Sequence, residues 1–386
     1  MPLRTPTINE ILAFSVQSAQ GSEATPVTAD IAPFISCDLS PNPQNLERQD
    51  KGLGRSFFGY VRGGDSSSQW KADLELVLAA AATPVAKSSI ENLLVASMGG
   101  TTVNFSDTVQ ASPTPTTTVF AVGNAASLKV NDPISIDCGG SVGFVMRTIT
   151  NIATNTLTVS PALPNAPATS AKVKARIIRL ATAPVYLTIS NWLRASDNST
   201  TAYSRKAIDA LVGTLQIDFN QAIIRLSASG PAATITRTGV AAIPSLPSFS
   251  DVAQARNFGS VWWGGSALTV YGLQINLDNG AQALPVPFGS QFPDGTVFNA
   301  RKVKFNLDID ANDVNASLMT DSENKTQRNL FGYSGDGEGK FFAFNFPSAV
   351  IQLFNYDKGS ATVQLKSTDS AGIATAADNE FVIAIA

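Results

Sequence analysis

The sequence predicts a mainly β protein with two tandem β-sandwich or barrel units, each with a flanking helix, and a small inserted β-domain. Two observations lead to this prediction. Runs in which apolar and polar residues alternate with a period of two recur along the chain. Elements of the same kind also occur twice in the same order. The charged share of 15% agrees with this class, because β-rich chains are often heavy in Thr, Ser and Ala.

The first round of elements begins with a short strand at Phe34–Leu39 and an alternating strand at Trp70–Leu78. Further strand runs at Val185–Leu193 and Ala207–Ser229 close it. Residues 1–33 have few periodic apolar positions. They are either an arm that orders on a neighbouring subunit or a flexible tail.

A helix is predicted at Ser88–Met98, between the strands of the first round. Ser88 and Glu91 have the spacing of a capping box, and Gly99 favours a helix end. An apolar stripe at helical spacing should pack on a sheet, and it consists of Ile90, Leu93, Leu94 and Met98.

The second round repeats this order of elements. It contains a strand run at Leu268–Asn279, an alternating strand at Lys302–Asp310, a helix candidate at Asn312–Met319, and runs at Lys340–Phe346 and Ala349–Lys366. Pro347, between the last two runs, is expected to act as a hinge or an edge breaker.

Changes in composition divide the chain into parts. Short strands at about ten-residue spacing in a Thr- and Pro-rich stretch predict a small β-barrel or sandwich, inserted because the first round resumes after it. A Pro-, Ser- and Ala-rich stretch separates the two rounds. The predicted parts are a first unit at 1–100 and 175–240, the insert at 101–174, a linker at 241–259 and a second unit at 260–386.

The composition excludes several chemistries. The chain has no histidine, which removes Ser-His-Asp and Cys-His catalysis and most zinc sites. Cys37 and Cys138 lack CxxC spacing and are interpreted as reduced thiols. A net charge of −3 gives no general sign of a nucleic-acid or membrane binder, and no run suggests a signal peptide or a membrane span. We expect no catalytic residues, metal or cofactor.

Two local patterns have ordinary structural explanations. Asp308, Asp310 and Asp313 lack the Gly and Glu of a calcium loop, so alternation on a strand explains them better. Trp262 and Trp263 would point to opposite faces of a strand, which favours packing over a sugar-stacking platform.

The order of the segments resembles the tail tube protein (major tail protein) of long-tailed, siphovirus-type bacteriophages. The segments that carry this resemblance are Trp70–Leu78 with the helix ending Met98-Gly99-Gly100, Tyr186–Ile189, Gly213–Phe219, Leu226–Gly230, Gly272–Asn279, Ala300–Asp310 and Phe344–Val350. They span most of the chain outside 101–174, where members of this family often carry a small β-domain.

The resemblance implies a structural virion protein, made in the host cytoplasm, whose rings stack into a tube for DNA ejection. Two units per chain imply a homotrimer with pseudo-sixfold symmetry, and a homohexamer is the alternative. Other tail proteins (tape measure, tail terminator and distal tail) would be partners, with transient passage of DNA and no membrane. A cell-surface or carbohydrate-binding β protein that uses Trp262 and Trp263 remains an alternative function.

A tube that lets DNA slide needs a neutral or acidic lining, because a basic lining would hold phosphates. The candidates for the lumen are the polar strand faces with Asp73, Glu75, Asp218, Asn276, Asp278, Asp308 and Asp310. Lys71, Lys302 and Lys304 interrupt these faces. Exposure to the outer solvent is the alternative for each residue.

Overall fold

The fold is mainly β with large antiparallel sheets, which confirms the predicted class. The computed structural model describes residues 10–41, 43–47, 60–65, 68–78, 87–194, 200–245, 252–255, 259–310, 316–335, 337–352, 354–357 and 364–386. Within these residues the α-helices are α1 (Glu91–Met98) and α2 (Ala316–Asn324).

Eight strands run side by side and form what we call the central sheet. Their spatial order is β3 (Ser36–Ser40), β6 (Ser68–Glu75), β17 (Arg225–Ala232), β16 (Thr214–Asp218), β22 (Val270–Asp278), β25 (Lys302–Asp310), β29 (Gln364–Ser367) and β28 (Phe354–Asp357). Every neighbouring pair is antiparallel. The predicted run at Ala207–Ser229 therefore contains several strands, and the predicted strand at Lys302–Asp310 has the observed bounds of β25.

Two further sets of strands pack on the central sheet. One has the order β18 (Thr234–Ala242), β15 (Thr201–Ala210), β14 (Leu187–Arg194), β1 (Glu10–Val16) and β2 (Ile31–Ala32). The other has the order β21 (Ser266–Leu268), β20 (Ser260–Trp263), β26 (Arg328–Ser334), β27 (Phe342–Val350) and β31 (Val382–Ile385). Strand β30 (Ser370–Gly372) connects β27 to β25. Since β1 pairs with β14 along its whole length, residues 10–16 belong to a sheet of their own chain, and residues 1–9 lie outside the described part.

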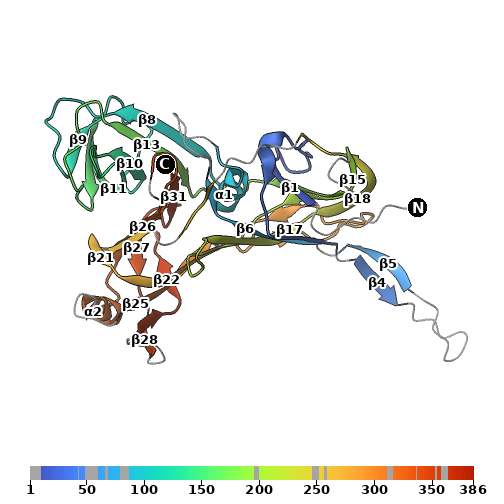
Figure 1. The fold of residues 1–386 in the computed structure, drawn as a ribbon. Helices are drawn as coiled ribbons and strands as arrows, with labels where there is room; N and C mark the ends of the chain where they lie inside the picture. The colour runs from blue at the N-terminus through green and yellow to red at the C-terminus, as the bar shows by residue number, and fades with distance from the viewer. Residues whose placement is uncertain are drawn as a thin grey trace, which may run out of the picture.

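A third group of strands lies at one end of the molecule, beside β31 (Figure 1). It contains β8 (Thr102–Thr108), β9 (Val119–Ala121), β10 (Pro133–Asp137), β11 (Phe144–Ala153), β12 (Thr156–Ser160) and β13 (Lys172–Arg179). Strand β13 pairs with β8 and with β31, so it continues past position 174 without a break. The apolar core of this group also includes Phe331, Phe341 and Ala343 from the C-terminal strands.

Short strands and one turn of 3-10 helix complete the described structure. They are η1 (Thr28–Asp30), β4 (Pro43–Glu47), β5 (Tyr60–Asp65), β7 (Val77–Leu78), β19 (Val252–Ala253), β23 (Gln282–Ala283) and β24 (Thr296–Val297). The predicted strand at Trp70–Leu78 is thus divided into β6 and β7, since β7 pairs with β19.

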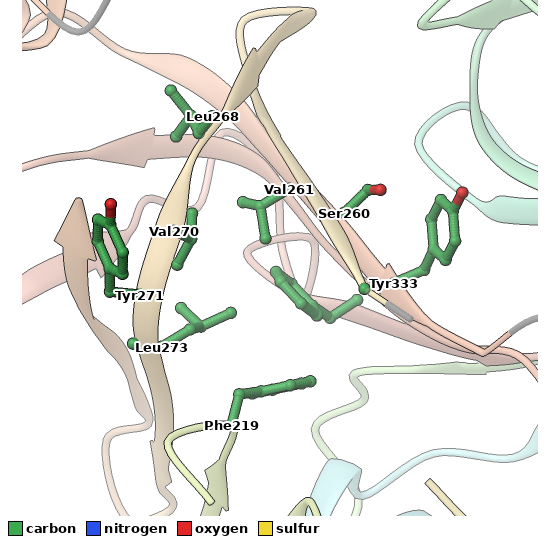
Figure 2. A pocket seen from close by; sticks show the side chains of 11 residues that line it. Phe219, Ser260, Val261, Leu268, Val270, Tyr271, Leu273 and Tyr333 are labelled. Carbon is green, nitrogen blue, oxygen red and sulfur yellow. The ribbon is translucent and has the colours of Figure 1, made fainter. Parts of the chain in front are cut away.

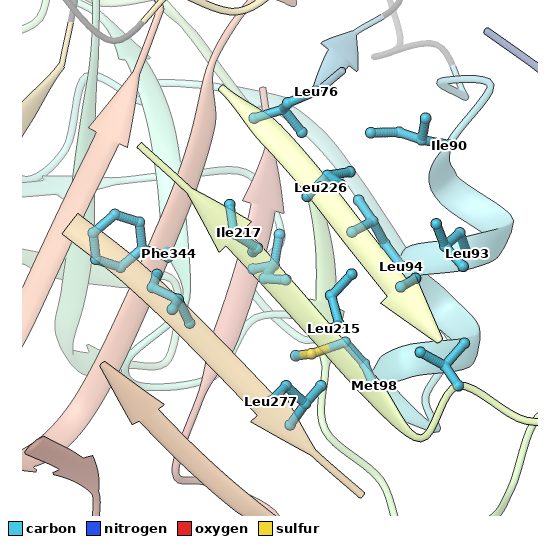
Figure 3. Packing of buried hydrophobic residues seen from close by; sticks show 14 of the residues in the cluster. Leu76, Ile90, Leu93, Leu94, Met98, Leu215, Ile217, Leu226, Leu277 and Phe344 are labelled. Carbon is cyan, nitrogen blue, oxygen red and sulfur yellow. The ribbon is translucent and has the colours of Figure 1, made fainter. Parts of the chain in front are cut away.

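Helix α1 packs on the apolar face of the central sheet (Figure 3). Its predicted stripe of Ile90, Leu93, Leu94 and Met98 is fully buried, and Gly99 ends the helix with a φ of +65°, so both predictions are confirmed.

The predicted capping box at the start of α1 is wrong. The helix begins at Glu91, and the Ser88 hydroxyl donates to the Val77 carbonyl at 3.1 Å. The Glu91 carboxylate accepts instead from Thr102 Oγ1 at 2.9 Å and from Arg176 Nη2 at 2.8 Å. A buried carboxylate needs such partners, and the cation comes from a strand 85 positions further along the chain.

The prediction for Pro347 is also wrong, because β27 runs through it without interruption. The register between β26 and β27 shifts there, so that Pro347 and Ser348 lie opposite Asn329 alone. This is a β-bulge, which tolerates a residue without an N–H donor. Helix α2 extends to Asn324, beyond the predicted end at Met319, and residues 312–315 of that candidate lie outside the described part.

Candidate functional site: the polar face of the central sheet

The central sheet has one polar face and one apolar face. Across six neighbouring strands, the residues directly opposite one another on one face are Ser36, Asp73, Ser227, Gln216, Asn276 and Lys304. One position further along, the row on the other face is Cys37, Ala72, Ala228, Leu215, Leu277 and Val303. The alternation within each strand is therefore kept in register across the sheet.

All seven residues that the sequence analysis selected lie on the polar face. They are Asp73, Glu75, Asp218, Asn276, Asp278, Asp308 and Asp310. The structure therefore brings together residues from β6, β16, β22 and β25, which are separated by up to 237 positions in the sequence.

Three charged residues of this face were missed: Asp38, Arg225 and Lys366. They lie on β3, β17 and β29, where the strand signal is shorter. The alternating stretch Arg225-Leu226-Ser227-Ala228-Ser229 was the one signal that could have identified Arg225.

Asp73 has the best-defined environment on the polar face. Its carboxylate accepts from Ser36 Oγ at 2.8 Å and from Ser227 Oγ, and it lies 3.6 Å from Lys71 Nζ. Burial alone would raise the pKa of Asp73. The hydroxyl donors and the Lys71 charge outweigh burial and hold this pKa below its ordinary value, so the carboxylate stays ionised.

Each basic residue of the polar face has a carboxylate close by. In the strand register, Lys71 is opposite Asp38, Lys302 is opposite Asp278, and Lys366 is opposite Asp308. Opposite charges at such positions attract each other.

The two remaining cations are matched in the same way. Arg225 lies between Glu75 on β6 and Asp218 on β16. Lys304 Nζ lies 2.7 Å from Asp369 Oδ1. On the described part of the face, seven carboxylates (Asp38, Asp73, Glu75, Asp218, Asp278, Asp308, Asp310) stand against five cations, a difference of two negative charges. Lys71, Lys302 and Lys304 therefore do not form a basic patch.

The best-formed cavity lies away from this face and is lined by uncharged residues (Figure 2). Its volume is about 310 Å³, and its lining includes Phe219, Val261, Leu273 and Phe344. The described lining residues offer no carboxylate, amine or thiol for acid–base or nucleophilic chemistry.

Metal and thiol chemistry find little support elsewhere in the described part of the chain. It contains no group of three or more acidic or cysteine side chains placed to hold a metal ion. Cys37 and Cys138 are both free thiols. Burial raises the pKa of Cys37 to about 12, which keeps this thiol protonated and unreactive.

The two neighbouring tryptophans point into different surroundings, as predicted. Trp263 is 4% exposed, and its Nε1 donates to Asp321 Oδ2 at 2.8 Å. Trp262 stacks on Phe331 with a centroid separation of 5.3 Å, and the Arg147 guanidinium lies over its ring. They do not form a shared flat platform.

Comparison with known proteins adds no relative. A scan against protein-family models found no match, and a search of curated proteins found none either. Neither helix of the described structure has the length and apolar character to cross a membrane.

Proposed function

We propose that this chain is the structural subunit of a phage tail tube, without enzymatic activity. Copies join through their central sheets into a closed ring, with the polar face inside as a neutral-to-acidic conduit for DNA. The observation that carries the proposal is the central sheet itself. It is eight strands wide and polar on one face, and among the described residues neither β3 nor β28 has a partner on its outer side.

Support for two tandem units comes from the order of strand pairing. In the first half, the central-sheet order is β3, β6, β17 and β16. In the second half it is β22, β25, β29 and β28. Each half therefore places its first, second, last and second-last strands in that order, and a helix follows the second strand in both.

The strands that pack on the central sheet follow the same rule. Their order is β1, β14, β15 and β18 in the first half, and β20, β26, β27 and β31 in the second. On this basis the segment 101–174 is an insert between α1 and β14, and the polypeptide from β20 onwards is the second tail-tube-type unit.

The junction between the two halves suggests how copies join. Strand β16, at the edge of the first half, pairs with β22, at the edge of the second. The same relation would pair β28 of one copy with β3 of the next. This contact is head-to-tail, so it closes into a ring when the rotation permits. Three copies would bring six such units around the axis, which favours the homotrimer over the homohexamer.

The electrostatics of the polar face agree with a conduit that does not retain DNA. Non-specific affinity for DNA comes mainly from cations that neutralise phosphates and release counterions. Each cation on this face lies near a carboxylate, and the face carries excess negative charge. Duplex DNA would therefore meet few basic groups free to bind it.

The remaining parts of the proposal rest on the resemblance. They are stacking of rings along the tail, contacts with tape measure, tail terminator and distal tail proteins, and a place in the virion. The carbohydrate-binding alternative has less support, because Trp263 is buried and bonded to Asp321.

Light scattering and negative-stain electron microscopy of the purified protein test the proposal. It predicts a concentration-dependent species with three times the chain mass, and rings or tubes with a central hole. Monomeric protein at every concentration and salt condition would contradict it.

A further inference from the structure

The two halves differ in what their first long connection contacts. In the second half, the β22–β25 connection packs on the first half. Asn279 Nδ2 donates to the carbonyls of Ser97 and Val212 at 2.8 and 2.9 Å, and Thr296 Oγ1 donates to the Asp209 carbonyl at 2.8 Å. Asn279 and Thr296 are both buried. This connection therefore covers the last turn of α1 and the end of β15.

The equivalent connection of the first half has no such contacts in its described part. It runs between β3 and β6 and contains the hairpin of β4 and β5, which pair only with each other. Figure 1 shows this hairpin extending away from the body of the protein. A two-stranded hairpin in water is marginally stable by itself, so a partner surface would stabilise it.

The second half has a surface that lacks the corresponding cover. In α1, every residue except Val95 is buried. In the described side chains of α2, Thr320, Glu323 and Asn324 are exposed, and they lie in its second half. This is the position that Asn279 covers at Ser97 of α1.

The two features lie at opposite ends of the molecule. Figure 1 shows α2 near β28 at one end and the β4–β5 hairpin at the other. A head-to-tail contact between β28 and the next copy's β3 would bring the hairpin of that copy towards α2.

From this comparison we infer that the β4–β5 hairpin is a clamp between subunits. It docks on the neighbouring copy at the exposed end of α2 and the adjoining end of β27, as the β22–β25 connection docks on α1 and β15 within one chain. The partner is a second copy of this chain in the same ring. This inference rests on the proposed ring and assigns the contact that holds neighbouring copies together beside the sheet.

A pair of matched loop variants tests the inference. The first replaces residues 41–67 with a short Gly-containing turn, since Ser40 and Gln69 are already opposite each other in the sheet. The second shortens the β22–β25 connection by replacing residues 284–295 in the same way. We expect the first variant to keep the thermal midpoint of the monomer and to need about tenfold or more protein to form rings. The second should lower the midpoint of the monomer, because its contacts lie within one chain.

A blocking variant on the acceptor surface provides a second measurement. Glu323→Trp adds bulk at the exposed end of α2, and Val240→Trp adds the same bulk on β18, where Val240 is 74% exposed. Glu323→Trp should weaken ring formation and Val240→Trp should not. Hydrogen exchange in residues 320–328 should slow when the wild type assembles.

The outcomes separate this inference from the proposed function. If the wild type never forms rings, the proposed function fails. If the wild type forms rings and the 41–67 variant forms them at the same concentration, the clamp is wrong and the ring stands. Rings that form normally but no longer stack would assign the hairpin to contacts between rings and would also overturn the clamp.

Discussion

The charge of the polar face can be reversed with two substitutions, Asp218→Lys and Asp278→Lys. The described face then has five carboxylates and seven cations, so an excess of two negative charges becomes an excess of two positive charges. The new lysines lie opposite Arg225 and Lys302, and each like-charge pair should cost roughly 0.2–1 kcal/mol of stability. This cost is small enough for the fold to persist.

The expected gain in DNA affinity follows from counterion release. In a ring of three copies, the two substitutions place six new lysines on the lining. If each neutralises one phosphate, the logarithm of the binding constant should fall by about 5 per tenfold increase in salt. Between about 50 and 200 mM salt this amounts to a loss of roughly three orders of magnitude in affinity.

The assay is the binding of a short duplex DNA across a salt series, measured by fluorescence anisotropy on assembled and unassembled protein. A matched control carries Asp137→Lys and Asp294→Lys, which add the same charge away from the polar face. Asp137 accepts a turn hydrogen bond from Gly139 N, as Asp218 does from Asn220 N, so the local cost is comparable. Tight, salt-dependent binding by the wild type, or equal binding by the control, would refute a lining that avoids phosphates.

Three further predictions concern stability and the alternative function. Leu94→Ala should lower the free energy of unfolding by about 2–5 kcal/mol in urea titration, because the side chain is fully buried between α1 and the sheet, whereas Val240→Ala should change it by less than about 0.5 kcal/mol. The lowered pKa of Asp73 means that this residue stabilises the fold above the pKa of the unfolded chain and that this contribution is lost as the pH falls; Asp73→Asn should therefore flatten the loss of stability below about pH 4, and an unchanged acid titration would refute the assignment. Trp263→Ala should lower the thermal midpoint, at a cost of about 3–5 kcal/mol, and leave glycan-array signals at background. A specific glycan signal in the wild type that this variant loses would instead favour the carbohydrate-binding alternative.

Local patterns predicted the parts of the fold that depend on neighbouring residues in the sequence. The alternation from Lys302 to Asp310 gave the bounds of β25, and helical spacing identified the buried stripe of α1. Both signals are set by strand and helix geometry alone. The true start of α1 could not be predicted in this way, because Glu91 is held by Arg176 on the distant strand β13.

The candidate site was predicted in its composition and missed in its arrangement. Alternation placed Asp73 and Asp308 on polar strand faces, but the common face follows from pairings such as β16 with β22, whose register the sequence does not state. The pairing of Lys71 with Asp38 and Lys366 with Asp308 depends on the same long-range register. For that reason the lysines looked like interruptions of the lining.

The order of the strand pairs also explains why the repeat is weak in the letters of the sequence. The two halves share alternation and connectivity, and these constrain which positions are apolar rather than which residue occupies them. Strands β6 and β25 both place apolar residues such as Leu74 and Leu307 on the core side, with different polar residues between them.

A cross-section of the assembled particle by cryo-electron microscopy tests the central claim most directly. The account predicts a closed ring of three copies, with β28 of each chain hydrogen-bonded to β3 of the next and with Asp73, Asp218 and Asp278 facing a hollow axis. A particle in which these strand edges stay apart, or in which the polar face lies on the outside, would contradict it.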